Sequence, residues 1–371
     1  MKVLLVFGTR PEAIKMCPLA LELKKHKEIS TVVCLTGQHR EMLRQVMDAF
    51  DIKEDYNLDI MRPKQTLTTI TCDILEKLEP VLQDEKPDVV LVHGDTTTSY
   101  AAALAAFYQQ IPVGHVEAGL RTGNIYSPYP EELNRQMTGR IATFHFSPTL
   151  LNKQNLEKEN ITKNIFITGN TVIDAFKTTV KDNYKFSETL LQAVNFENYR
   201  VITVTAHRRE NLGEPLKQIC RAIKRIVNDN PDVLVVYPVH LNPLVQNTVH
   251  EILGNNERIK LITPVDVLDM HNLMAKSFMV MTDSGGLQEE APHFGKPVLV
   301  MRTETERPEA VDAGTVKVVG VDENVIYNNA NELLNNKASY DKMAHAVNPY
   351  GDGHASERIA EILIKEVCKD A

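Results

Sequence analysis

Short apolar runs alternate with amphipathic stretches along the whole chain. The first run, residues 3–7, is apolar at every position, which is typical of a parallel strand buried on both faces. After it, Ala13, Met16, Ala20 and Leu23 recur at helical spacing. Alternation of this kind predicts βαβ units and a parallel sheet.

The predicted strands form two series, separated by a polar stretch at residues 172–198 that we interpret as helix and linker. We therefore expect an α/β protein with two Rossmann-like domains, residues 1–172 and 173–352, and a substrate cleft between their strand ends. A last helix within residues 353–371 is expected to cross back onto the first domain. The predicted strands span residues 3–7, 31–36, 88–93, 113–117, 143–147 and 165–168, then 201–205, 233–237, 259–262, 278–282, 298–301 and 316–319.

Composition narrows the functional classes. The 371 residues suffice for two domains, and 43% hydrophobic with 24% charged residues is ordinary for a globular protein. The net charge of -8 argues against general binding to nucleic acid or to an anionic membrane. Five scattered cysteines without a C-x-x-C pair favour a reducing cytoplasm. The start at Met1 leads directly into the first strand, so we expect no signal peptide, and no apolar run could span a bilayer.

The loop after the first strand carries two cations, Arg10 and Lys15. Ligands of open α/β sheets bind at the carboxyl ends of the strands, so these cations predict an anionic ligand, most simply a phosphate. The spacing is neither G-x-G-x-x-G nor a Walker A lysine motif. We therefore expect no dinucleotide cofactor, and no metal site is predicted because the His and Cys residues lack ligand spacing.

Three carboxylates follow predicted strands or begin a helix in the first half: Asp95, Glu117 and Glu131. Each has a structural alternative, because Asp95 could cap a helix, Glu117 could pair with Arg121, and a helix dipole could stabilise Glu131. A glutamate ending an apolar strand favours function, since unpaired buried carboxylates are costly. Carboxylates with separated pKa values can supply both an acid and a base.

The second half has its own polar groups after strands. His207 begins a basic triplet that includes Arg208, and the triplet suggests anion binding or a solvated charge run. A strand then leads through Ser284, Gly285 and Gly286 into a predicted helix, whose bare backbone N–H groups could bind an anion. The remaining candidates of this half are Glu290, which could accept ribose hydroxyls, Arg307 for phosphate, and His240 at a strand end.

Taken together, these motifs resemble the non-hydrolysing UDP-N-acetylglucosamine 2-epimerase family of bacteria, in order and over nearly the whole chain. The matching segments are residues 7–15, 37–40, 93–97, 116–121, 130–135, 169–174, 206–211, 283–286, 289–292 and 306–309.

The resemblance implies a GT-B-like fold and reversible conversion of UDP-N-acetylglucosamine to UDP-N-acetylmannosamine for surface polysaccharide synthesis. The reaction would proceed by elimination of UDP to a 2-acetamidoglucal and re-addition of UDP. No redox cofactor is required, and the family suggests a homodimer.

The resemblance also implies roles for individual residues. Asp95, Glu117 and Glu131 match the catalytic carboxylates, without an assignment of each to one face of C2. Arg10, Lys15 and His207 match groups that hold the substrate or leaving phosphate, and Lys15 and His207 are assigned to catalysis as well. The UDP pocket would be formed by Ser284, Gly285, Gly286, Glu290 and Arg307. A second, activating substrate site would use Gln38, Arg208 and His240.

Three alternatives stay open at this point. A hydrolysing relative would release free N-acetylmannosamine and UDP. A GT-B glycosyltransferase would use the same cleft for an acceptor. A nucleotide-sugar sensor would bind without turnover, although three carboxylates near an anionic ligand argue against a pure binder.

Overall fold

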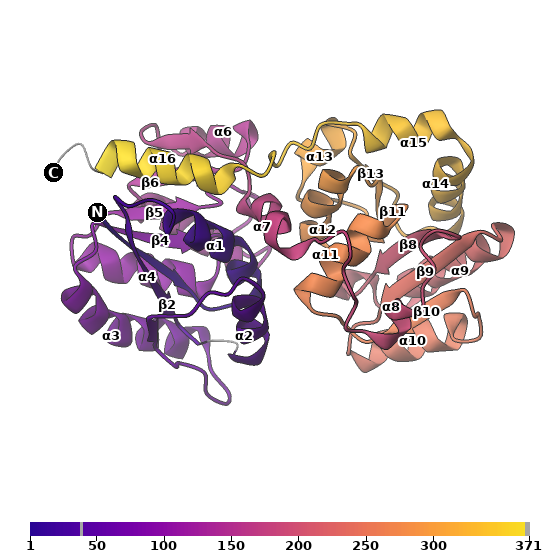
Figure 1. Ribbon diagram of the computed structural model, residues 1–371, viewed down its shortest axis with the longest axis horizontal. Coiled ribbons are helices and arrows are strands. Elements are labelled where there is room, and N and C mark those ends of the chain that lie inside the picture. The colour runs from indigo at the N-terminus through magenta and orange to yellow at the C-terminus, as the bar shows by residue number, and fades with distance from the viewer. Residues whose placement is uncertain (38–39, 368–371) are drawn as a thin grey trace. The chain divides into compact units, whose positions relative to one another are not determined.

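The computed structural model describes residues 1–37 and 40–367. The chain divides into two compact units, each with its own sheet (Figure 1). Met1–Thr178 and Tyr350–Ala371 form the first unit, and Thr179–Pro349 forms the second. The chain thus leaves the first unit once and returns to it once.

The first unit is built on a parallel sheet of 7 strands in the order β3-β2-β1-β4-β5-β6-β7. Its first six strands follow the Rossmann order 3-2-1-4-5-6. The strands are β1 (Lys2–Phe7), β2 (Ser30–Leu35), β3 (Tyr56–Asn57), β4 (Val89–His93), β5 (Val113–Val116), β6 (Phe144–Ser147) and β7 (Ile165–Ile167).

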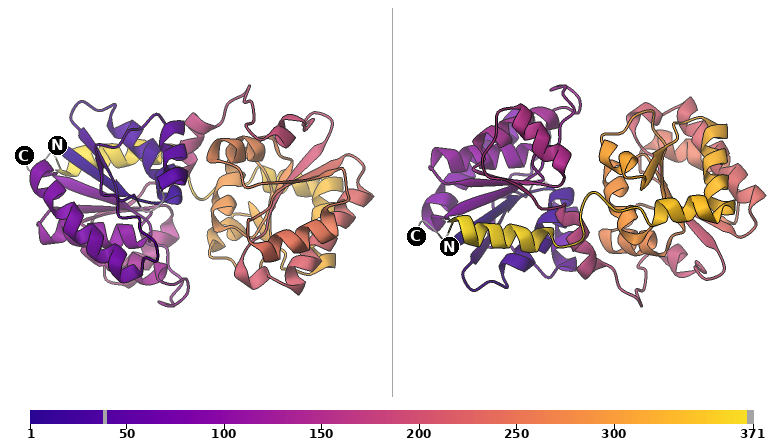
Figure 2. Two further views of the ribbon diagram at one scale, coloured as in Figure 1. Left: turned by 90° about the horizontal axis from the view of Figure 1, so that it is seen from below. Right: turned by 90° about the horizontal axis from the view of Figure 1, so that it is seen from above.

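Helices cover both faces of this sheet. The C-terminal helix α16 packs against α1, and in both views of Figure 2 it lies on the first unit. The helices are α1 (Arg10–Leu23), α2 (Arg40–Ala49), α3 (Leu67–Glu85), α4 (Thr97–Tyr108), α5 (Glu131–Ile141), α6 (Leu150–Lys158), α7 (Thr171–Thr179) and α16 (Ala355–Val367).

The second unit repeats the same strand order. Its sheet of 6 parallel strands runs β10-β9-β8-β11-β12-β13, which is again 3-2-1-4-5-6 when counted from β8. The strands are β8 (Arg200–Thr205), β9 (Val233–Pro238), β10 (Ile259–Ile262), β11 (Met279–Thr282), β12 (Val298–Val300) and β13 (Val316–Val318). The helices are α8 (Thr189–Gln192), α9 (Glu214–Asp229), α10 (Pro243–Leu253), α11 (Val267–Lys276), α12 (Gly285–Glu290), α13 (Pro308–Asp312), α14 (Glu323–Asn335) and α15 (Lys337–Ala344), with short 3-10 turns at Arg209–Asn211 and Ala291–Phe294.

This strand order fixes where a ligand can enter each sheet. The order reverses between β1 and β4 in the first unit and between β8 and β11 in the second. Crevices outside the carboxyl ends of the strands at such switch points are the usual ligand sites of open α/β sheets. The loops that follow these four strands are therefore the parts of the fold on which a site is expected.

The turn from β1 into α1 shows why this sequence folds as it does. A Cβ on Gly8 would lie 1.8 Å from Oγ1 of Thr36, so a side chain cannot be accommodated there. Thr9 caps α1 in a capping box with Glu12, and Pro11 occupies the first turn. The positions predicted from helical spacing, including Met16 and Leu23, are fully buried.

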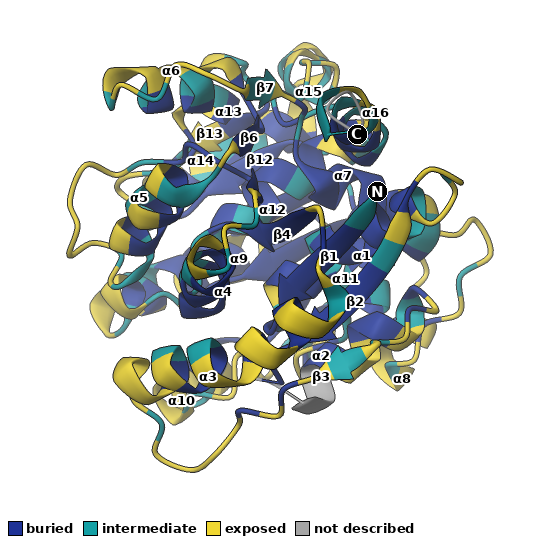
Figure 3. Cartoon of the chain, turned by 90° about the vertical axis from the view of Figure 1, so that its left-hand side faces the viewer, coloured by how far each residue is buried: buried dark blue, intermediate teal, exposed yellow. Residues whose placement is uncertain are grey.

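Both sheets are buried between their helices. Strands such as β1 and β4 are dark blue in Figure 3, whereas the outer surfaces of α3 and α10 are exposed. Leu4, Val6 and Val92 pack beneath α3 and α4 in one core cluster, and a second cluster gathers β8, β9 and β11 with α9 and α14. Within the described residues, no helix is both long and apolar enough to cross a membrane.

The predicted fold class is confirmed, and a strand lies in each of the twelve predicted segments. One short strand, Tyr56–Asn57, was missed because two residues carry no periodic pattern. The segment predicted at 113–117 ends one residue early, since Glu117 adopts a left-handed backbone with φ of 64°. The polar stretch at 172–198 contains most of α7, all of α8 and the chain that joins them. Cys17, Cys34, Cys72 and Cys220 are free thiols, and Cys368 lies outside the described residues.

Candidate functional site

Glu117 is the most constrained carboxylate of the first unit. It is 8% exposed, and its Oε2 accepts hydrogen bonds from Lys15 Nζ and, at 2.9 Å, from Asn170 Nδ2. The ring Nε2 of His93 lies 3.6 Å from the same oxygen. Burial alone would raise the pKa of Glu117, but the charges of Lys15 and His93 hold it well below its usual value. The carboxylate is therefore ionised although it is buried.

The alternative that Glu117 pairs with Arg121 is wrong. The Arg121 guanidinium instead forms an ion pair with Glu159, in which Nε lies 2.6 Å from Oε1. Glu117 instead pairs with Lys15 of helix α1. This helix follows β1, one of the two strands at the switch point.

Asp95 lies in the loop between β4 and α4. The N-cap of α4 is Thr96, whose hydroxyl accepts from Ser99 N, so the capping role considered for Asp95 is wrong. The Asp95 carboxylate pairs with the buried guanidinium of Arg135, and its main-chain oxygen accepts from Asn134 Nδ2 at 2.9 Å. Both partners belong to α5, which therefore fixes the orientation of Asp95.

The two glutamates at the start of α5 differ. Glu132 is fully buried, and its carboxylate accepts from Thr122 N at 3.0 Å and Gly123 N at 3.3 Å, which ties down the preceding loop. Glu131 is half-buried, and among the described residues its buried Oε2 has no hydrogen-bond partner. A desolvated oxygen without a donor is costly and is suited to accept a proton or a ligand hydroxyl.

Glu12 connects the loops after β1 and β4. Its carboxylate accepts from Gly8 N and Thr9 N in one loop and from the hydroxyls of Thr96 and Ser99 in the other, at distances from 2.7 to 3.1 Å. Arg10 is the first residue of α1, directly after this anchored turn. The loop that carries Arg10 and the loop that carries Asp95 are thus held in a fixed relation on the two sides of the switch point.

In the second unit, the buried carboxylate of Asp283 organises the basic loop after β8. Its Oδ2 accepts from the backbone N–H of His207 and of Arg208, each at 2.8 Å, and from Asn211 Nδ2 at 3.0 Å. His207 Nδ1 lies 3.5 Å from Asp283 Oδ1. Burial lowers the pKa of His207, and Asp283 opposes this only in part. Its ring stacks on His240 with centroids 5.3 Å apart.

The glycine turn after β11 faces two guanidinium groups. A Cβ on Gly285 would lie 3.8 Å from an Arg307 nitrogen and 4.0 Å from an Arg208 nitrogen. Arg307 is buried and is held from behind by an ion pair with Glu289. Ser284 makes no side-chain cap to α12, so its hydroxyl is not used in starting that helix.

Glu290 lies at the end of α12, and its Oε1 would be 3.1 Å from a Cβ on Gly286. Its Oε2 is 3.6 Å from Nε2 of the buried His271, whose Nδ1 is 2.8 Å from the Thr179 hydroxyl. The second unit therefore gathers His207, Arg208, Ser284, Gly285, Gly286, Glu290 and Arg307 around one switch point. Gln38, predicted for a second substrate site, lies outside the described residues.

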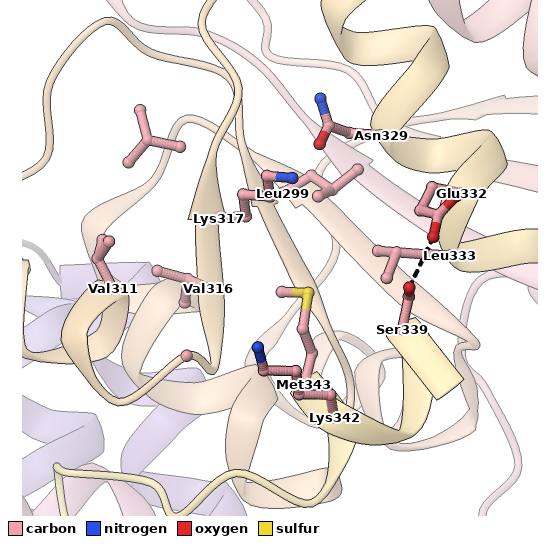
Figure 4. Close-up of a pocket in the computed structure, with 12 residues that line it drawn as sticks. Leu299, Val311, Val316, Lys317, Asn329, Glu332, Leu333, Ser339, Lys342 and Met343 are labelled. Carbon is pink, nitrogen blue, oxygen red and sulfur yellow. Dashed lines mark hydrogen bonds between the residues drawn. The ribbon is translucent and has the colours of Figure 1, made fainter. Parts of the chain in front are cut away.

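A separate pocket of the second unit, about 640 Å³ in volume, contains none of the predicted site residues (Figure 4). Leu299, Val316, Leu333 and Met343 line it, and Ser339 donates to Glu332 at its rim. It lies along the edge strand β13, away from the switch point between β8 and β11. Within residues 1–37 and 40–367, no group of three or more His, Cys, Asp or Glu residues could hold a metal ion.

Sequence reasoning gave no role to several residues that shape these sites: Glu12, His93, Arg135, Asn170, His271, Asp283 and Glu289. Arg135 had one signal, because it follows Glu131 by one helical turn and therefore shares its face of α5. Asp283 had another, since a carboxylate ending a buried strand must find partners. Asn170 lies in the matching segment 169–174, but no local spacing indicated its partner Glu117, which is 53 positions away.

The chain is therefore an α/β protein with two Rossmann-like sheets, and each sheet has charged side chains at its switch point. The family profile described as UDP-N-acetylglucosamine 2-epimerase matches residues 21–364. The chain belongs to the UDP-N-acetylglucosamine 2-epimerase family.

Known proteins agree with this placement over the full length. The UDP-N-acetylglucosamine 2-epimerase of Bacillus subtilis is 59% identical over 365 residues, covering 98% of this chain and 95% of that protein. The crystal structure of the Neisseria meningitidis enzyme bound to UDP-N-acetylglucosamine is 51% identical, with a TM-score of 0.90 over 99% of this chain and 100% of that one. The Methanocaldococcus jannaschii enzyme, solved with UDP-N-acetylglucosamine and UDP, is 34% identical, with a TM-score of 0.80 over 98% and 100%.

Proposed function

We propose that this protein interconverts UDP-N-acetylglucosamine and UDP-N-acetylmannosamine without net hydrolysis. Its family membership supports the substrate, and relatives have been crystallised with UDP-N-acetylglucosamine and with UDP. The observation that carries the proposal is Glu117, a buried carboxylate that Lys15 and His93 keep ionised beside a ligand-binding edge. Buried carboxylates with strongly shifted pKa values cluster at functional sites, so Glu117 supports a catalytic role.

The chemistry explains why acid–base groups and cations are both required. The C2 proton of the sugar is not adjacent to a carbonyl, so simple deprotonation would leave a high-energy carbanion. In the proposed elimination, a base removes the C2 proton, that electron pair forms the C1–C2 double bond, and the C1–O bond breaks to release UDP. Re-addition of UDP at C1, with proton return to the other face of C2, completes the epimerisation.

We assign the proton transfers to Asp95, Glu117 and Glu131 jointly. Glu117 is ionised, Asp95 is oriented by Arg135, and Glu131 has an oxygen without a donor among the described residues. Arg10 and Lys15 belong to the loop and helix after β1, where positive charge would oppose the negative charge that builds on the departing diphosphate.

We assign the nucleotide to the second unit. Arg307 and Arg208 approach the bare backbone at Gly285, so they suit phosphate oxygens, and the Ser284 hydroxyl adds a donor. Glu290 would accept hydrogen bonds from ribose hydroxyls, and His207 would contact the leaving phosphate. Arg208 and His240, with Gln38, would also serve the activating second substrate site.

Incubation with UDP-N-acetylglucosamine in deuterated water tests the reaction. We expect UDP-N-acetylmannosamine to form, with deuterium at C2 of the sugar pool, because the abstracted proton exchanges with solvent before it returns. Accumulation of free N-acetylmannosamine would instead indicate the hydrolysing reaction. An unchanged sugar with tight UDP binding would indicate a sensor or a transferase.

We also propose a cytoplasmic homodimer that supplies surface polysaccharide synthesis. Four large apolar side chains on the adjacent helices α4 and α5 are exposed: Phe107, Tyr108, Leu133 and Met137. An apolar surface of this kind suits a second copy of the chain. Sedimentation of wild type and of a Phe107→Ser, Tyr108→Ser double variant tests it: the variant should be largely monomeric at concentrations at which the wild type is still dimeric.

A further inference from the structure

The carboxylate of Glu117 is contacted very unequally at its two oxygens. Three side chains contact Oε2. Asn170 Nδ2 donates a hydrogen bond to it at 2.9 Å, Lys15 Nζ donates another, and the ring of His93 lies nearby. Oε1 accepts no hydrogen bond from the residues that the structure describes. It faces the backbone of Gly94, where a Cβ would lie 3.5 Å from it. Oε2 is therefore held by the protein, whereas Oε1 is available to a ligand.

Asn170 can act only as a donor to Glu117. Its Oδ1 already accepts from the backbone N–H of Val172 at 3.1 Å, in a local turn at the start of α7. The amide group is planar, so this hydrogen bond directs Nδ2 to the opposite side, toward Glu117. The side chain is 3% exposed, and water cannot readily replace it.

The backbone of Asn170 is fixed by the segment that returns from the second unit. Its N–H donates to the carbonyl of Tyr350 at 2.7 Å. Gly169 has a φ of 88°, and a Cβ on it would lie 3.3 Å from Cα of Gly351, so two bare backbones meet here. Asn170 is thus held from behind by the first residues of the chain after Pro349.

We propose that Asn170 is a positioning residue: it fixes Oε2 of Glu117, so that Oε1 is the oxygen that exchanges the proton with the sugar. This inference rests on the proposed function, in which Glu117 transfers a proton. Lys15 donates to the same oxygen, but its ammonium group has three donors on a flexible stem and can follow the carboxylate as it rotates. The directional amide, whose own oxygen is already engaged, removes that freedom.

Substitutions at Asn170 test the inference through kcat rather than KM. In Asn170→Ala we expect kcat to fall by about 10- to 100-fold, the scale of one hydrogen bond to a charged group, while KM changes by less than about threefold. The acidic limb of the kcat profile should move to higher pH, because the charged form of Glu117 loses a donor. The other titratable groups that face Glu117 are Lys15 and His93, and both are retained.

Asn170→Asp separates positioning from packing. This side chain has the same shape, so a purely structural role predicts a milder effect than that of alanine. The inference predicts the reverse at pH 8, because a second carboxylate replaces the donor and repels Glu117. Asn164→Gly is the matched control: its amide donates to Thr143 O at 3.1 Å, and glycine keeps the positive φ of 53°, so kcat and the pH profile should stay unchanged.

A titration without substrate distinguishes failure of this inference from failure of the proposed function. Carbon-13 NMR of Glu-labelled protein, with Glu117→Gln to assign the signal, should show a higher Glu117 pKa in Asn170→Ala than in the wild type. If the wild type forms no UDP-N-acetylmannosamine, the proposed function is wrong, yet this readout still tests Asn170. Unchanged kcat, pH profile and Glu117 pKa in Asn170→Ala, or a milder effect of aspartate than of alanine, would overturn the inference.

Discussion

The two units share one strand order but differ in which charged group is held by a counter-charge at the switch point. In the first unit, two of the proposed acid–base groups are carboxylates that each pair with a cation: Glu117 with Lys15, and Asp95 with Arg135. In the second unit, the proposed phosphate ligand Arg307 is a cation, and it pairs with the buried carboxylate of Glu289.

The comparison shows the same arrangement with opposite charges: a cation holds each carboxylate in the first unit, and a carboxylate holds Arg307 in the second. In each case a buried group of opposite charge keeps the functional side chain ionised and oriented. Separating the two would leave a buried charge without compensation, which is costly. Asp283 acts in a related way, because its buried carboxylate accepts hydrogen bonds from the backbone N–H groups of His207 and Arg208. We expect substitutions at the site of the first unit to lower kcat, and substitutions at the site of the second unit to weaken nucleotide binding.

The largest effect should follow from Glu117→Gln, which removes the charge while keeping an acceptor for Lys15. We expect epimerisation to fall by about 10²- to 10⁴-fold, the scale of lost acid–base catalysis, with UDP affinity nearly unchanged. Turnover assays and calorimetric titration with UDP measure the two quantities. Glu54→Gln, which breaks the exposed pair with Arg44, should leave both unchanged. A variant that lost UDP affinity in step with turnover would contradict the division of roles.

Acid should destabilise the first unit strongly, through His115 and His145. Burial lowers their pKa values to about 3 and about 4, whereas the unfolded chain titrates near 6.5. Between these values the unfolded state binds more protons, so the free energy of unfolding falls as the pH falls. From pH 7 to pH 5 the loss should be about 2 kcal/mol for each histidine.

Hydrogen exchange resolved by unit, at pH 7 and pH 5, measures this loss. The pKa values of His207 and His293 are also lowered by burial, but both side chains are more exposed, so the second unit should lose less. Glu117 does not contribute in this window, because its depressed pKa removes stability only at lower pH. Equal losses in the two units would contradict the expectation.

Arg307→Lys should weaken UDP binding about tenfold while kcat stays within about threefold. Lysine keeps the charge that Glu289 needs but lacks the planar fork that binds two phosphate oxygens at once. Titration with UDP and initial rates at saturating substrate measure the two effects. Arg302→Lys is a nearby control that keeps a cation for Glu210. A tenfold loss in kcat with normal UDP affinity would place Arg307 in the chemical step instead.

The smallest effect should come from Ser284→Ala. Because the hydroxyl caps no helix, we expect the free energy of unfolding to change by less than about 0.5 kcal/mol. UDP affinity should fall about 3- to 10-fold, the scale of one neutral hydrogen bond. Thr96→Ala is the informative partner variant, since Thr96 does cap α4 and should cost about 1 kcal/mol of stability. A large loss of stability in Ser284→Ala would show that its hydroxyl has a structural role.

Much of the fold was predictable because strand and helix patterns are local. Apolar runs such as residues 3–7 and 201–205 coincide with β1 and β8 to within one residue. Glu117 shows the limit of that reasoning: an apolar run indicated a strand through it, yet its left-handed backbone ends β5 at Val116. Periodicity reports which side chains are buried and carries no information on where a backbone turns.

The candidate residues were also found by position, since every polar group after a strand reaches the same sheet edge. Their partners were not found. Arg121 was the expected partner of Glu117 because it is near in sequence, but Arg121 pairs with Glu159 and Glu117 with Lys15 and Asn170. Local spacing favours near neighbours, whereas a folded sheet brings together loops that are far apart in the chain.

The sequence by itself determined two Rossmann-like sheets, the residues at their carboxyl ends and, through its motifs, the family. Only the tertiary structure decided which counter-charge stands behind which functional group. Strand order places β1 and β4 side by side and brings the loop at Asn170 to Glu117. Burial then makes each of these pairings obligatory, because a charge without its partner is expensive in an interior of low dielectric.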